Sequence, residues 1–233
     1  MCTVTYLPKS NNEFILTHNR DEHFSRGIAQ FPSLKNISNQ NILAPIDSNA
    51  GGTWIATSQH YTLCLLNGGF EKHVSQPPYR HSRGKIILDF FEYNSLSDFI
   101  QTYDVSQLEP FTLILIEHHS NDLHQCVFEG QNLHHTKMQK DQAHIWSSST
   151  LYKVEEIQQR KKHFNIFLQE SKLTQDEIIA FHTNSYKTLE HEDILINRNE
   201  ILKTVSLTSI LKSSSISLTY IDFIQSKQLT LAL

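Results

Sequence analysis

The sequence predicts an α+β fold in which antiparallel sheets are covered by helices. Strand-like alternation is grouped in runs at the start, in the middle and at the end of the chain, and helical periodicity is grouped between these runs. Short polar turns join the strands, whereas a parallel sheet would need a long crossover after each strand. Because no linker-like run divides the 233 residues, the chain is expected to form a single domain, residues 1–233.

Two hairpins are predicted near the start of the chain. Residues 2–7 and 13–18 read as strands joined by the turn-forming "PKSNN", and "GGTWIATS" with "YTLCLLN" forms the second pair. Between the hairpins, "NRDEHFSRG" is too polar for a core strand. The stretch that follows it, with Pro32 and Pro45, is expected to be rich in loops.

The middle of the chain predicts helices and then strands. Apolar residues recur at helical spacing in "SRGKIILDFFEY", with Ser82 as the expected N-cap, and again in "SLSDFIQTY". The strands "FTLILIEHH", "DLHQCVFEG", "NLHHTKM" and "AHIWSSS" follow at short intervals. Their spacing predicts an antiparallel meander.

The last third repeats this order. "LYKVEEIQQRKKHFNIFLQES" and "TQDEIIAFHTN" carry helical periodicity, and the threonine of the second is the expected cap. The basic run at Arg160–Lys162 is expected to be a solvated helix face. "LKTVSLTSI", "SISLTYIDF" and "KQLTLAL" then return to strand-like alternation.

Composition excludes several classes of function. Lys and Arg number 20 against 24 Asp and Glu, a net charge of −4 without a basic patch, so no nucleic-acid partner is expected. No apolar run is long enough to span a bilayer or to form a signal peptide, so we expect a soluble, cytoplasmic protein without integral membrane association. The odd cysteine count and the absence of C-x-x-C argue against a disulfide framework, and Cys64 and Cys126 are expected to be buried.

The 14 histidines invite a metal site, yet the sequence gives little support for one. H-E-x-x-H is absent, and the cysteines are not grouped with the histidines. Surface histidines are the expected account, and no metal is predicted.

The cysteine at position 2 carries the strongest chemical signal. Initiator methionine is generally removed when the next side chain is small, so Cys2 is expected to become the amino terminus. A free α-amino group titrates near about 7.7–8.0, so it can act as a base at neutral pH beside its own thiol. Nucleophile and base would then belong to one residue.

Charged residues at the end of the second strand are the expected support for this thiol. The thiolate is the reactive form, so a neighbouring cation that lowers the pKa of Cys2 is needed. Arg20 is the candidate, because the predicted hairpin brings it near residue 2, and Asp21 is placed to hold the α-amine or the guanidinium. Adjacent strand residues face opposite ways, so a bulge or strand end is expected at this point.

An ordered set of motifs resembles the NRDE family, also called the transport and Golgi organisation family. The motifs are "MCTVTYL", "NRDE" at Asn19–Glu22, "GGTW" at Gly51–Trp54, the asparagine of "LLNGG" and "SRG" at Ser82–Gly84. That family in turn resembles N-terminal-nucleophile hydrolases with an N-terminal cysteine, such as penicillin V acylase and bile-salt hydrolase. The resemblance implies a four-layer αββα sandwich.

The resemblance also implies roles for individual residues. Cys2 would attack an amide carbonyl, Arg20 and Asp21 would steady the thiol and the amine, and Asn67 would donate to the oxyanion. An amide N–H aimed at a developing oxyanion can lower the barrier by roughly 3–4 kcal/mol. "WSSST" stands where such amidases place another asparagine, so Ser148 is the candidate there.

Four further residues have open alternatives. Gly68 either lets backbone approach the substrate or forms an ordinary turn. Trp54 either floors a substrate pocket or fills the core. Asn19 and Glu22 either take part in the site or stabilise a turn.

Two functions follow from these residues and the resemblance. The first is a hydrolase that cleaves a linear, non-peptide amide through a thioester on Cys2 and needs no cofactor. The second is a protein of the NRDE family that handles haem or lipid without turnover, with haem as a ligand rather than a cofactor. In both cases the expected partner is a small molecule.

Overall fold

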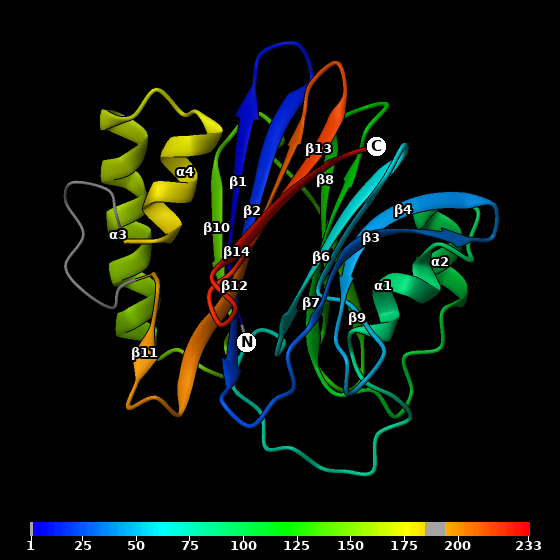
Figure 1. The fold of residues 1–233 in the computed structure, drawn as a ribbon. Helices are drawn as coiled ribbons and strands as arrows, with labels where there is room; N and C mark the ends of the chain where they lie inside the picture. The colour runs from blue at the N-terminus through cyan, green and yellow to red at the C-terminus, as the bar shows by residue number, and fades with distance from the viewer. Residues whose placement is uncertain (1, 185–193) are drawn as a thin grey trace. The chain divides into compact units, whose positions relative to one another are not determined.

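The structure, a computed structural model, describes residues 2–184 and 194–233 and divides into two compact units. The first unit combines the two ends of the chain, residues up to Arg26 with Asp141–Ala232. The second comprises Gly27–Lys140 together with Leu233. Each unit is an antiparallel sheet with helices on one face, as Figure 1 shows. The prediction of a single domain stays a prediction.

The sheet of the first unit has the order β10-β1-β2-β12-β13-β14, and β11 pairs with β12. Its strands are β1 (Cys2–Lys9), β2 (Glu13–His23), β10 (His144–Ser147), β11 (Asn197–Arg198), β12 (Leu202–Lys212), β13 (Ile216–Asp222) and β14 (Lys227–Ala232). Helices α3 (Val154–Glu170) and α4 (Gln175–His182) lie against this sheet. The first strand of the chain is therefore an interior strand.

The sheet of the second unit follows sequence order from β3 to β9. Its strands are β3 (Gln30–Ile37), β4 (Gln40–Ile46), β5 (Ile55–Ser58), β6 (Tyr61–Asn67), β7 (Phe111–Glu117), β8 (Asp122–Phe128) and β9 (Leu133–Met138). Helices α1 (Lys85–Phe90) and α2 (Leu96–Thr102) cover one face. Consecutive strands pair because short turns join them, as the sequence predicts for this region.

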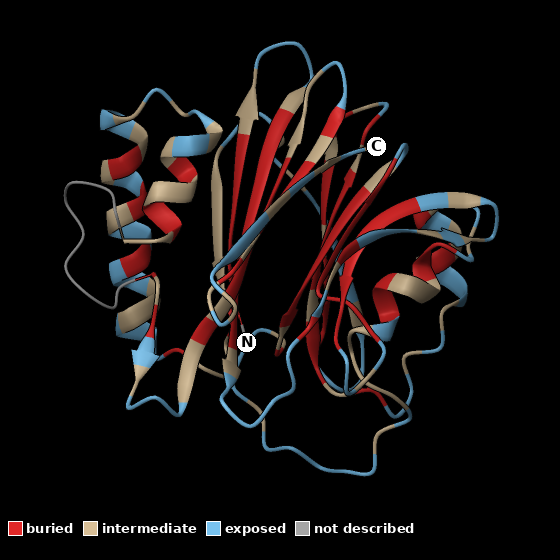
Figure 2. Ribbon diagram, in the orientation of Figure 1, coloured by how far each residue is buried: buried red, intermediate tan, exposed pale blue. Residues whose placement is uncertain are grey.

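Each unit has an apolar core between its sheet and its helices, and Figure 2 shows the buried residues along these strands. In the first unit Leu7 and Ile15 of the sheet pack with Phe164, Phe167 and Phe181 of the helices. The second core is larger and gathers aromatic side chains of α1 and α2 over β6, β7 and β8. Burial of such side chains stabilises each layer pair by about 1.5–3 kcal/mol per residue.

Of the two predicted helix caps, one is confirmed and one is wrong. Thr174 caps α4 in a capping box with Glu177, as predicted, and Ser95 caps α2 by accepting from the Asp98 amide. Ser82 is not the cap of α1, whose N-cap is Gly84 without a side-chain hydrogen bond. Ser82 instead closes a preceding turn, because its carbonyl accepts from the Lys85 amide at 3.0 Å.

Strands replace two of the predicted loops. Strand β2 continues through "NRDEH" to His23, because its polar side chains find partners inside the protein. The stretch with Pro32 and Pro45 forms the hairpin of β3 and β4. Pro32 falls where the register of β3 shifts, in an edge strand, which is where a residue without an N–H is tolerated.

Strand β10 is a correction to the predicted meander. The segment "AHIWSSS" does not follow β9 but crosses to the other unit, where it pairs with β1 from Thr3↔Ser147 to Tyr6↔His144. The alternation of residues along a strand does not determine which strand it pairs with. The spacing of the short strands therefore could not predict that β10 pairs with β1.

The glycines of "GGTW" and "SRG" meet in the second unit. A Cβ on Gly52 would lie 2.5 Å from the backbone carbon of Gly84, and the Thr53 amide donates to the Gly84 carbonyl at 2.9 Å. Only residues without a side chain allow this approach. Two motifs of the sequence are thus explained by one backbone contact.

Three expectations about single residue types have mixed outcomes. Cys64 and Cys126 are fully buried as predicted, and burial raises the pKa of Cys126 to about 12. The histidines are not all on the surface, since His18 and His182 have no exposed area. Within residues 2–184 and 194–233, no helix has the length and apolar character needed to cross a bilayer.

Candidate active site

Cys2 and Arg20 face each other across the first hairpin. Cys2 is the first residue of β1, and its register partner on β2 is Arg20. Both side chains are at least 95% buried, and they lie on the sheet face opposite to α3 and α4. The predicted neighbourhood of Cys2 and Arg20 is therefore a direct consequence of the turn at residues 10–12.

The net electrostatic effect on Cys2 differs from the expectation. Burial is the largest influence and raises the pKa of the thiol, and the charge of Asp21 raises the pKa further. Arg20 lowers the pKa of Cys2, as expected, but by less than burial raises it. Cys2 is consequently a protonated thiol at neutral pH, and its activation needs a base.

Arg20 also has a partner on its own strand. Its guanidinium lies 3.5 Å from the Glu22 carboxylate, and both residues are on the same face of β2. Glu22 is mostly buried, so this ion pair is protected from solvent screening. Glu22 thus orients Arg20 beside Cys2.

Asp21 points to the opposite face of β2, toward the helices. Thr204 of β12 donates a hydrogen bond to Asp21 Oδ1 at 2.6 Å, and the Tyr152 hydroxyl donates to Oδ2. The predicted irregularity exists, but it lies in β12, where the register shifts between Thr204 and Ser206. Burial raises the pKa of Asp21, while the two hydrogen bonds and the charge of Arg160 act to lower it.

Arg160 is buried, which corrects the expectation of a solvated "RKK" face. Lys161 and Lys162 are exposed, but Arg160 turns inward from α3 and places its guanidinium 3.4 Å from the centre of the Tyr152 ring. This is a close cation–π contact. A buried positive charge therefore lies over the ring of Tyr152, whose hydroxyl binds Asp21.

Ser148 and Asn19 take different places around Cys2. The Ser148 amide donates to the Cys2 carbonyl at 3.0 Å, and the Ser148 hydroxyl lies 3.0 Å from the Thr150 hydroxyl. Asn19 faces the helices, where its amide donates to the carbonyls of His182 and Ile194. Asn19 thus ties β2 to the end of α4, and its part in the site stays a prediction.

Asn67, Gly68 and Trp54 belong to the second unit and are described there by themselves. Asn67 is the last residue of β6, and Gly68 has a φ of +95°, a conformation that favours glycine. The Gly68 amide and carbonyl bond Pro110 and Thr112. Trp54 is buried, and its carbonyl accepts from Leu65. Their roles toward Cys2 stay predictions, and Met1, whose removal is expected, lies outside the described residues.

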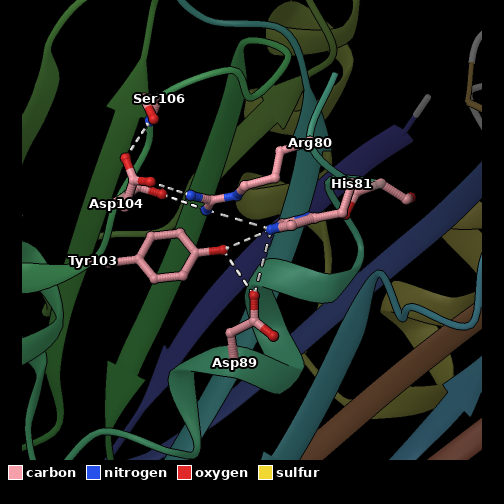
Figure 3. Close-up of polar contacts among 7 residues, drawn as sticks. Arg80, His81, Asp89, Tyr103, Asp104 and Ser106 are labelled. Atoms are coloured by element: carbon pink, nitrogen blue, oxygen red, sulfur yellow. Dashed lines mark hydrogen bonds and ion pairs between the residues drawn. The ribbon is translucent and has the colours of Figure 1, made fainter. Parts of the chain in front are cut away.

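A polar cluster in the second unit has a different character (Figure 3). Arg80 donates to the Asp104 carboxylate, and Tyr103 donates to Asp89 at 2.8 Å. His81 joins these pairs, with its Nε2 3.7 Å from Asp89. Burial raises the pKa of Tyr103, so its hydroxyl stays protonated and donates. These contacts fasten the segment before α1 to α1 and to the end of α2.

One group in the described chain has the spacing of metal ligands. Glu117, Asp122 and His124 offer ligand atoms within 4.8 Å of one another. Asp122, however, already binds Lys137 at 2.7 Å, with Lys140 at 3.7 Å. The lysines balance the charge that would attract a cation, so we assign no ion to this group.

Tyr152, Thr204 and Arg160 were not identified from the sequence. A signal for Arg160 does exist, because it occupies the position between Ile157 and Phe164 on the apolar stripe of α3. An arginine in such a stripe indicates a buried charge with a partner. Tyr152 and Thr204 carry no such signal, since their contacts depend on which strands are neighbours.

The fold defines a structural class. Each antiparallel sheet carries helices on one face, and a buried cysteine heads the first strand. A penicillin V acylase from Agrobacterium tumefaciens is similar in structure, with a TM-score of 0.59 and 10% sequence identity over 100% of this chain and 86% of that chain. This likeness confirms the predicted αββα fold class and, at that identity, shows the fold alone.

Sequence comparison gives the family. Residues 1–228 match the family described as Transport and Golgi organisation 2, and the chain belongs to that family. The resemblance seen in the ordered motifs is thereby confirmed. No curated protein matches the chain.

Proposed function

We propose that the protein is an N-terminal-nucleophile hydrolase that cleaves a linear, non-peptide amide through Cys2 after removal of Met1. The observation that carries the proposal is the buried pair of Cys2, at the start of β1, and Arg20 of β2. Asp21 lies on the opposite face of β2 from Arg20. The likeness of the fold to a penicillin V acylase and the membership of the family support this proposal. The substrate is a small molecule, and the location is cytoplasmic.

The raised pKa of the thiol determines how the first step must occur. A buried, protonated Cys2 needs a base within reach, and the α-amine of Cys2 supplies one once Met1 is removed. The amine takes the thiol proton as sulfur bonds to the amide carbon, and the carbonyl oxygen becomes an oxyanion. The family resemblance seen in the sequence implies the Asn67 side chain as a donor to that oxyanion.

Collapse of the tetrahedral intermediate completes acyl transfer. The carbon–nitrogen bond breaks, and the leaving amine takes the proton held by the α-ammonium group. A thioester on Cys2 remains. Water then attacks the thioester carbon and gives its proton to the α-amine, and the departing sulfur recovers that proton as the carboxylic acid leaves.

The surrounding charges have separate tasks. Arg20, oriented by Glu22, favours the developing thiolate. Asp21 favours a positively charged α-amine and so stabilises the state in which the amine holds the thiol proton. Ser148 holds the Cys2 carbonyl through its amide and fixes the direction of the strand end.

The decisive experiment combines intact mass with an activity-directed thiol electrophile. We expect the purified protein to lack Met1 and to gain one label on Cys2. Cys2→Ala should abolish labelling. The double variant Cys64→Ser with Cys126→Ser should retain it, because the proposal places the activating α-amine beside the Cys2 thiol. Retained Met1, or labelling of Cys64 or Cys126 instead of Cys2, would contradict the proposal.

The alternative of haem or lipid handling predicts a different pattern. A handling protein would bind haem or a lipid with unchanged affinity after Cys2→Ala, and it would not turn over amides. Hydrolysis lost with Cys2→Ala would argue against this alternative.

A further inference from the structure

We propose that Tyr152 and Arg160 are positioning residues that hold Asp21 as a fixed carboxylate on the helix-facing side of β2, the strand that pairs with the Cys2 strand. This inference rests on the proposed function, in which Asp21 acts on the α-amine of Cys2. It adds a chain of buried contacts that starts at helix α3 and ends at β2.

The first link is a pair of hydrogen bonds to the Asp21 carboxylate. Tyr152 donates to Oδ2, and Thr204 donates to Oδ1 at 2.6 Å. Asp21 has no exposed area, and each of its oxygens thus accepts from a hydroxyl. Two donors, one on each oxygen, restrict the orientation of the carboxylate, and they replace the water that burial removes.

The second link supplies a counter-charge. Arg160 is 3% exposed, and its guanidinium lies over the Tyr152 ring, 3.4 Å from the ring centre, while the hydroxyl of the same ring binds the carboxylate. A buried cation near a buried anion stabilises both charges, because interactions in this environment are weakly screened. The cation also polarises the Tyr152 hydroxyl and strengthens its donation.

The third link anchors the chain of contacts to the sheet. Thr204 Oγ1 accepts from the Ile196 amide at 3.0 Å, and the Thr204 amide donates to the Ile196 carbonyl at 3.0 Å. The register shift in β12 follows directly after Thr204, and it lets this residue and Ser206 meet successive residues of β2. The bulge therefore has a function in aiming Thr204 at Asp21.

Other ionisable groups around this chain of contacts are few. His182 of α4 lies near Arg160, and burial first and then the charge of Arg160 lower the pKa of His182 to about 3, so it stays neutral. Arg198 of β11 lies 5.6 Å from the Tyr152 ring and pairs with Glu156. On the other face of the sheet lie the Cys2 thiol of β1 and Arg20 of β2. Arg20 there has Glu22 as its ion-pair partner, and its charge also acts on His18 and Tyr220.

A structural filler and a positioning residue differ in their effect on the ionisation of Asp21. The experiment measures the titration of the Asp21 side-chain carboxyl carbon by NMR, assigned with Asp21→Asn, and the alkylation of Cys2. Tyr152→Phe keeps the ring over Arg160 and removes only the hydroxyl. We expect it to move the Asp21 titration upward by about one pH unit, a tenfold change in the ionisation equilibrium.

Arg160→Met should give a shift of the same sign, because it removes the counter-charge and keeps an apolar stem against Tyr152. Should that variant not fold, Tyr152→Phe alone decides the question. The matched control is Tyr103→Phe, which also removes a tyrosine–aspartate hydrogen bond, at 2.8 Å to Asp89, but in the second unit. It should leave the Asp21 titration unchanged.

Failure of this inference is distinct from failure of the proposed function. An unchanged Asp21 titration in folded Tyr152→Phe would overturn the positioning role even if Cys2 is catalytic. Conversely, a Cys2 that is never alkylated would count against the hydrolase, while the NMR titration would still test the contacts of Asp21.

Discussion

Single residues in the first unit carry charges and polar groups that the fold removes from water. His182 is the clearest case, since it is fully buried and its Nε2 lies 2.8 Å from the Thr5 hydroxyl. Asp21, Arg160 and Arg20 are buried as well. Burial shifts the pKa values of Asp21 and His182, so the ionisation of these two groups couples to folding.

The free energy of unfolding should decrease as the pH is lowered from about 6.5 to about 3, in part because of His182. Its pKa is lowered to about 3 in the folded protein, by burial and by Arg160. In this window the unfolded chain binds the proton and the folded protein does not, so acid favours unfolding by up to about 1.4 kcal/mol per pH unit. His182→Gln should remove that share of the slope in urea unfolding measured at several pH values.

Exposed His119 provides the comparison for this measurement. His119→Gln should leave the pH dependence as it is, because folding does not remove this ring from water. An unchanged slope in His182→Gln would show that His182 is not kept neutral by burial.

Elements form here from local signals, and their caps are the sharpest of these. Thr174 and Glu177 bind each other's backbone amides at the start of α4, and the helix then presents Ile178 and Phe181 to the core. The cap of α4 was predicted from the sequence. The cap of α1 could not be predicted, because the contact of Gly84 with Gly52 determines where that helix begins.

Loss of the Thr174 cap should destabilise the first unit. Thr174→Ala removes the acceptor for the Glu177 amide, so we expect a loss of about 1 kcal/mol in the free energy of unfolding. Thr174→Asp should retain most of the stability, since aspartate also accepts from this amide. Equal stability of the two variants in urea titrations would show that the cap contributes nothing.

The whole molecule combines local hairpins with pairings between distant parts of the chain. In the first unit β2 pairs with β1, its neighbour in sequence, and with β12, about 190 residues away in the pairing Thr17↔Ser209. Strand β10 reaches β1 from the middle of the chain. The predicted hairpins were therefore correct where partners are adjacent, and the predicted meander was wrong where they are not.

The prediction of a single domain can be tested by calorimetry. If residues 1–233 form one domain, thermal unfolding should show one transition whose calorimetric and van't Hoff enthalpies agree. Two resolved transitions, or a ratio of the enthalpies well above one, would show instead that the two compact units unfold separately.

The sequence by itself determined the strand and helix periods, the first hairpin, and hence the meeting of Cys2 with Arg20, because each depends on residues close in the chain. Only the tertiary structure decided that Asp21 turns toward Tyr152, Thr204 and Arg160. Those contacts join segments more than 130 residues apart, and no local pattern encodes them. Burial, which raises the pKa of Cys2, is likewise a property of the assembled sheet rather than of the cysteine.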